Sequence, residues 1–129
     1  MYRADFLNPI AQHHTGRDAI VAAFKGVCAL PEEGETPGGF LLVNTALELS
    51  PHDSEVRNFI DGCLSEVEGF FYEQLESAKH CHAMDRSPPS RQTAQAILAL
   101  FLGLRVLTRT GPNKPAAAAI IAQVKAMLT

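Results

Sequence analysis

The chain has 129 residues, of which 47% are hydrophobic and 19% charged, and its net charge is −3. This length suits one domain with a sizeable core, and the composition is that of an ordinary globular protein. An acidic chain without a basic stripe is poorly suited to gripping a nucleic-acid backbone. We therefore expect no DNA contact by this chain alone.

The three cysteines, Cys28, Cys63 and Cys81, are widely spaced and form no CxxC pair. An odd number spread in this way is a poor disulfide framework and favours a reducing compartment. The first residues lack the basic and apolar regions of a secretory signal. The most apolar run, residues 94–107, is too short to span a bilayer core of roughly 30 Å. We expect a cytoplasmic protein that makes no membrane contact.

The hydrophobic pattern predicts an all-α fold, because apolar residues recur at spacings of three and four and strict alternation is missing. The expected helices, in chain order, cover about residues 2–13, 17–30, 39–49, 54–80, 89–110 and 115–128. The first is the weakest, because Pro9 would end or kink it. Asp53 is placed to cap the helix 54–80, since its carboxylate can accept bonds from the first-turn N–H groups. We expect a bundle of five to six helices in one domain, residues 1–129.

The helix 89–110 is apolar on more than one side. Eleven of the fourteen residues from Ala94 to Leu107 are apolar, whereas a helix packed on one side needs only a stripe. Paired with the helix 115–128, it could form a four-helix bundle across a two-fold axis. The alternative is a central helix buried within one chain. The predicted interface residues are Ile97, Leu98, Phe101, Leu104, Arg105, Ile121, Val124 and Leu128.

Three polar residues interrupt the apolar helix 39–49. Asn44 and Glu48 lie one turn apart on the same side, with Thr45 beside them. In one interpretation Glu48 faces solvent and the other two bond locally, since buried polar groups are usually satisfied. In the other, this side faces a pocket where a few polar groups orient a mainly apolar ligand.

Catalytic and metal-binding signals are weak. The stretch KHCHAMD contains His80, Cys81 and His82, but neighbours on a helix diverge by about 100°, so at most two of them could face one ion. No GxSxG elbow and no phosphate-binding glycine loop is found. Paired carboxylates fall on polar faces or in loops. We expect no enzyme activity, no metal and no cofactor.

Two segments resemble the ligand-binding domain of TetR/AcrR-family transcriptional regulators. The first is GGFLLVNTALELSPHDSEVRNFIDGCLSEVEGFFYEQLESA, which is similar to the family's helix, Pro-His-Asp turn and long helix. The second is ALFLGLRVLTRTGPNKPAAAAIIAQVKAML, which resembles the family's last two helices. The resemblance covers about Phe40 to Leu128 and is weaker from Tyr2 to Gly38.

The resemblance implies a homodimer built on the last two helices and a pocket for a small, mostly apolar effector. Asn44, Thr45 and Glu48 would then be ligand-binding residues. The pocket walls would come from Phe24, Cys28, Cys63, Val67, Phe70 and Phe71. In the family a three-helix DNA-binding head with a helix-turn-helix precedes this domain, and that head is missing here. The first ten residues resemble the end of the helix that joins the head to the ligand domain.

We therefore expect the effector-binding and homodimerisation domain of a TetR-family regulator. Two alternatives stay open. The first is a stand-alone headless protein that pairs with full-length regulators and modulates them. The second, with less in its favour, is a small metal-binding helical bundle.

Overall fold

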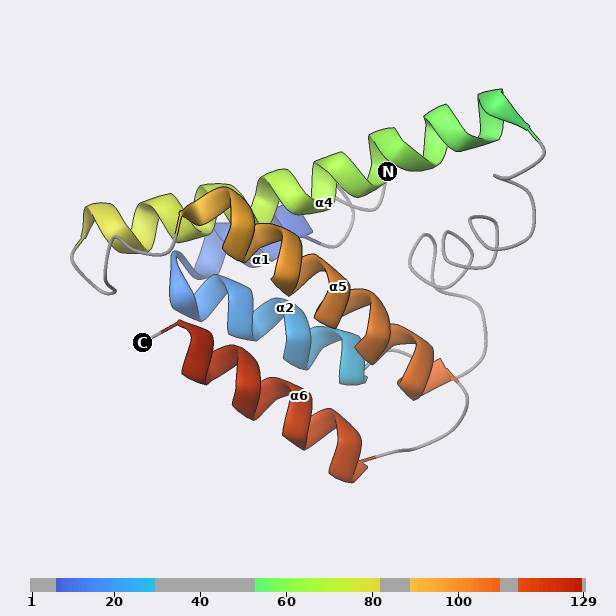
Figure 1. The fold of residues 1–129 in the computed structure, drawn as a ribbon. Helices are drawn as coiled ribbons and strands as arrows, with labels where there is room; N and C mark the ends of the chain where they lie inside the picture. Colours follow the sequence, from blue (N-terminus) through green and yellow to red (C-terminus); the bar gives the residue numbers. More distant parts are fainter. Residues whose placement is uncertain (1–6, 30–52, 82–88, 110–113, 129) are drawn as a thin grey trace.

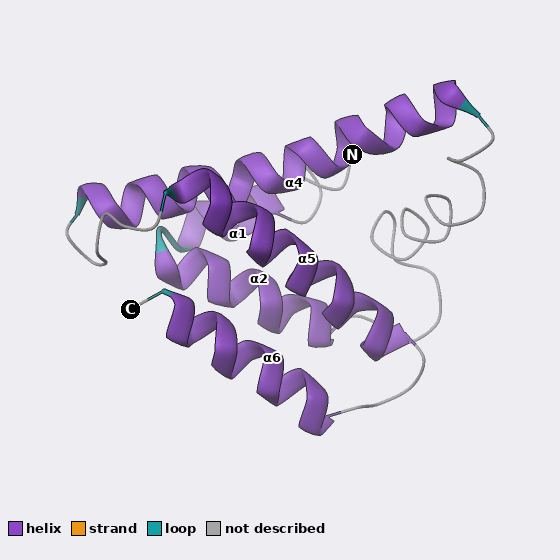
Figure 2. Ribbon diagram, in the orientation of Figure 1, coloured by secondary structure: helices purple, strands orange, loops and turns teal. Residues whose placement is uncertain are grey.

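The computed structural model describes residues 7–29, 53–81, 89–109 and 114–128 (Figure 1). Within them the chain forms five helices and no strand, so the predicted all-α class is confirmed (Figure 2). The helices are α1 (Asn8–His13), α2 (Arg17–Ala29), α4 (Ser54–His80), α5 (Ser90–Arg109) and α6 (Lys114–Met127). The predicted helix 39–49, with Asn44, Thr45 and Glu48, lies outside the described residues.

The N-terminal boundary of α4 could be predicted from the sequence because a capping residue, Asp53, precedes it. Asp53 has an extended backbone, and its Oδ1 accepts hydrogen bonds from the N–H groups of Glu55 and Val56 at 2.9 and 3.2 Å. Those two groups have no partner within the helix, so the carboxylate satisfies them. The predicted N-cap is confirmed.

The described helices pack as a bundle around α5. This helix contacts α4, α6 and α2, and α1 packs on α2. In Figure 1, α5 and α6 run in opposite directions, and the first turns of the 27-residue α4 extend beyond α5. The central place of α5 follows from its composition, because a helix with apolar residues on several sides needs several neighbours to cover them.

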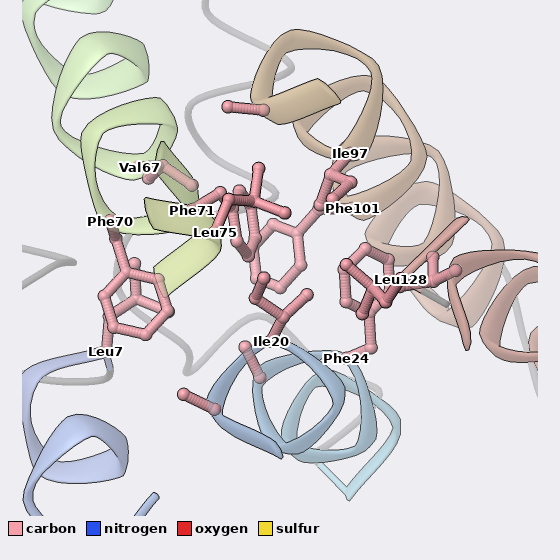
Figure 3. Close-up of a cluster of buried hydrophobic side chains, with 14 of the residues drawn as sticks. Leu7, Ile20, Phe24, Val67, Phe70, Phe71, Leu75, Ile97, Phe101 and Leu128 are labelled. Atoms are coloured by element: carbon pink, nitrogen blue, oxygen red, sulfur yellow. The ribbon is translucent and has the colours of Figure 1, made fainter. Parts of the chain in front are cut away.

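Aromatic side chains join α2, α4 and α5 at the centre of the core. The ring centroid of Phe101 lies 5.3 Å from that of Phe24 and 5.4 Å from that of Phe71, both in edge-on geometry (Figure 3). Phe24 and Phe71 are 6.0 Å apart. Such offset contacts suit the charge distribution of aromatic rings. Leu7, just before α1, is fully buried in the same cluster.

Candidate functional site

The predicted pocket walls divide into core residues and surface residues. Phe24, Val67, Phe70 and Phe71 are at most 3% exposed and belong to the packed core. Cys63 is half-buried, and Cys28 is exposed. The structure thus brings the aromatic members together as a cluster of contacting rings. Their role as ligand contacts stays a prediction, because the predicted polar partners lie outside the described residues.

The predicted interface residues are mostly covered by their own chain. Five apolar members and Arg105 are at most 1% exposed, because α5 meets three other helices. Those five are Ile97, Phe101, Leu104, Val124 and Leu128. Leu98 and Ile121 are half-buried and pack on the edge of the core. The intersubunit bundle stays a prediction, and within one chain most of these side chains form core contacts.

The outer faces of α5 and α6 were not singled out by the sequence analysis. Ala96 and Ala99 are exposed on α5. On α6 the exposed small residues are Ala118, Ala119, Ala122 and Ala126. The sequence signal for this face is the run AAAAIIA, residues 116–122, in which both isoleucines pack on the core and Ala118, Ala119 and Ala122 are exposed.

Charge is distributed unevenly along the chain. All fourteen acidic residues lie at or before Asp85, whereas six of the eleven Lys and Arg residues follow it. The helices α5 and α6 therefore contain no carboxylate side chain. Of the six basic residues, Arg105 is buried, which leaves the stretch from Ala94 to Leu107 without an exposed charge.

A polar hollow of about 750 Å³ lies between the end of α4 and the start of α5. Ser90 donates a 2.6 Å hydrogen bond to Glu76 Oε2, and the Tyr72 hydroxyl lies 3.5 Å from Oε1 of the same carboxylate. Arg91 pairs with Glu68 at 2.8 Å and covers the ring of Tyr72 at 4.2 Å. These polar groups bond to one another, so we interpret the hollow as a structural contact that holds α4 against α5.

The cluster at the end of α4 does not gather into a metal site within the described residues. His80 and Cys81 are exposed, and His82 lies outside the described part. No group of three His, Cys, Asp or Glu side chains is placed to hold an ion among the residues that the structure describes. In the same residues, no helix combines the length and hydropathy needed to cross a membrane.

Comparison with known proteins yields no relative. The sequence matches no protein-family model, no curated protein and no solved structure. The family resemblance therefore rests on the two sequence segments and on the order of the helices.

Proposed function

We propose that this chain is the effector-binding and homodimerisation domain of a TetR-family transcriptional regulator. The first support for the proposal is the resemblance of two sequence segments to that family. The described parts of these segments form α4, α5 and α6. The helix order adds to it, because a long α4 precedes two adjacent, oppositely directed helices. This is the arrangement that the family's last three helices lead one to expect.

The exposed alanines of α5 and α6 carry the proposal. The two helices pack together, and each exposes alanines with no carboxylate on either helix. In a two-fold dimer the same patch meets itself, so a charged patch would repel its copy and an uncharged one does not. Small side chains also permit a close approach of helix axes, whose separation depends on the residues at the contact.

The proposed contact differs in its members from the predicted list. Leu98 and Ile121, which are half-buried, remain at its edge, and Ala99 and Ala122 become central. The buried residues such as Phe101 act in support, because they hold α5 against α2 and α4. A charge at Phe101 would unfold the chain before it separated two chains.

Light scattering of purified variants tests this surface. Ala122→Glu places a carboxylate and its copy at the contact, so we expect a monomer at concentrations where the native chain is a dimer. Asn58→Glu, which adds the same charge at an exposed site on α4, is the matched control and should remain dimeric. A dimer of unchanged stability in Ala122→Glu would show that the contact lies elsewhere.

The effector half of the proposal calls for a small, mostly apolar ligand. Ligand binding would favour one of two head separations in an intact regulator, and only one of them would fit operator half-sites. The apolar fluorophore 1-N-phenylnaphthylamine serves as a probe. Saturable binding of one probe per chain is expected, and a linear, unsaturable signal would contradict the proposed effector site.

The alternative function, a headless protein that pairs with full-length regulators, would use the same surface. Isolation of mixed dimers with a complete regulator would favour this alternative.

A further inference from the structure

A groove between α2 and α6 is bordered by three cationic side chains. Arg17 and Lys25 come from α2, and Lys125 comes from the last turn of α6. The groove encloses about 640 Å³. Arg17, Val21 and Lys25 follow one another at spacings of four, so they lie along the same side of α2. The groove is therefore built by two helices that pack against each other.

The cations of this groove have no partner among the described residues. No ion pair or side-chain hydrogen bond joins Arg17, Lys25 or Lys125 to another described group. Asp18, in the first turn of α2, is the acidic residue of the lining. The Nε atom of Arg17 is buried, and its N–H meets no acceptor in the described part of the chain. Buried donors are almost always paired, so the Arg17 side chain is not held in place by a hydrogen bond from this atom within the described part of the chain.

The hollow between α4 and α5 provides a contrast. Its charged groups are used within the fold, where Glu76 accepts from Ser90 and Arg91 pairs with Glu68. The groove between α2 and α6 is lined by three cations and one carboxylate. An excess of positive charge around one groove raises the local potential and attracts an anion.

We propose that the groove between α2 and α6 binds the phosphate group of a small phosphorylated molecule. A phosphate dianion has more acceptor oxygens and more negative charge than a carboxylate. It therefore matches a groove with three cations better than a singly charged carboxylate does. The guanidinium of Arg17 would bind it through hydrogen bonds from its terminal N–H groups, and the two ammonium groups would neutralise it. The net charge of −3 gives the chain no general attraction for anions, so binding depends on this local convergence.

Calorimetric titration with inorganic pyrophosphate tests the proposal at fixed pH and ionic strength. One pyrophosphate should bind per chain. The double variant Lys25→Gln and Lys125→Gln removes two exposed cations and should weaken binding by about tenfold or more, because charge-assisted bonds are lost. Arg57→Gln, which removes an exposed cation from the first turns of α4, is the matched control and should bind as the native chain does.

A second variant separates binding from folding. Asp18→Asn removes the carboxylate that opposes the anion, so it should tighten binding by about threefold, which loss of structure cannot do. Co-sedimentation with vesicles that contain phosphatidic acid asks whether the phosphate belongs to a lipid. Binding to vesicles alone would assign the groove to a lipid headgroup, and binding to pyrophosphate alone to a soluble ligand. Failure to bind either probe, or an equal loss in Arg57→Gln, would overturn the proposal.

Discussion

The main-chain N–H of Gly16 donates a 2.8 Å hydrogen bond to Oε1 of Gln74, which ties the turn between α1 and α2 to α4. Gly16 has a φ of 62°, in the left-handed region that glycine adopts without strain. A Cβ at this position would lie 3.4 Å from the Cβ of Ala78. The turn therefore needs glycine to adopt this backbone conformation, and it needs the Gln74 side chain of α4 to accept the hydrogen bond from the Gly16 N–H.

Replacement of Gln74 tests this tie. Gln74→Ala leaves the N–H of Gly16 without its acceptor, so the free energy of unfolding should fall by about 1–2 kcal/mol. Urea denaturation measures the change. Gln92→Ala, which shortens an exposed glutamine on α5, should change it by less than about 0.5 kcal/mol. Equal losses in the two variants would mean that the bond is not a stabilising contact.

The aromatic cluster should dominate the stability of the bundle. Phe24 is fully buried and contacts the rings of Phe71 and Phe101, so Phe24→Ala should lower the free energy of unfolding by about 3–5 kcal/mol. Phe59 is 64% exposed on α4, and Phe59→Ala should cost less than about 1 kcal/mol. Thermal and urea unfolding of both variants provide the comparison. A small loss for Phe24→Ala would contradict the packed core described above.

The cap of α4 offers a further prediction. Asp53→Ala removes the acceptor of two first-turn N–H groups and should lower the free energy of unfolding by about 1 kcal/mol. Asp61→Ala removes the same kind of side chain from an exposed position inside the helix and should have little effect. If the two variants unfold at the same urea concentration, Asp53 does not act as a cap.

The reactivity of Cys63 follows from its surroundings. Burial, and after it the negative charge of Glu66, raise the pKa of the Cys63 thiol, so less of it is thiolate at neutral pH than in the unfolded chain. In a chain with the other two cysteines replaced by serine, iodoacetamide should react more slowly than after unfolding in urea. Glu66→Gln should lower the pKa and speed the folded reaction. An unchanged rate in Glu66→Gln would remove the carboxylate as a cause.

Local features of the sequence were sufficient to predict four of the five described helices. Asp53 caps the start of α4, and the observed bounds of α2, α4, α5 and α6 lie within one residue of the predicted ones. The prediction that Pro9 would end or kink the first helix was wrong, because α1 begins at Asn8 and Pro9 lies in its first turn, where a missing N–H costs no intrahelical bond. Capping and first-turn effects involve residues that are close together in the chain, so they can be recognised from the sequence alone.

The number of neighbours around a helix could not be predicted in the same way. An apolar residue such as Leu104 satisfies the pattern whether its own chain or a second chain covers it, and here its own chain does. The groove between α2 and α6 was missed for a related reason. Arg17 and Lys125 are distant in sequence, and only the packing of the two helices places them around one groove.

A reporter assay tests the proposal that this domain pairs two DNA-binding heads. A helix-turn-helix head that binds its operator only as a pair is fused before Met1, and repression of the reporter is measured. We expect repression by the native chain and by Asn58→Glu, and loss of repression with Ala122→Glu at equal protein level. Absence of repression by the well-folded native fusion, or full repression by Ala122→Glu, would show that the domain does not pair the heads through this surface.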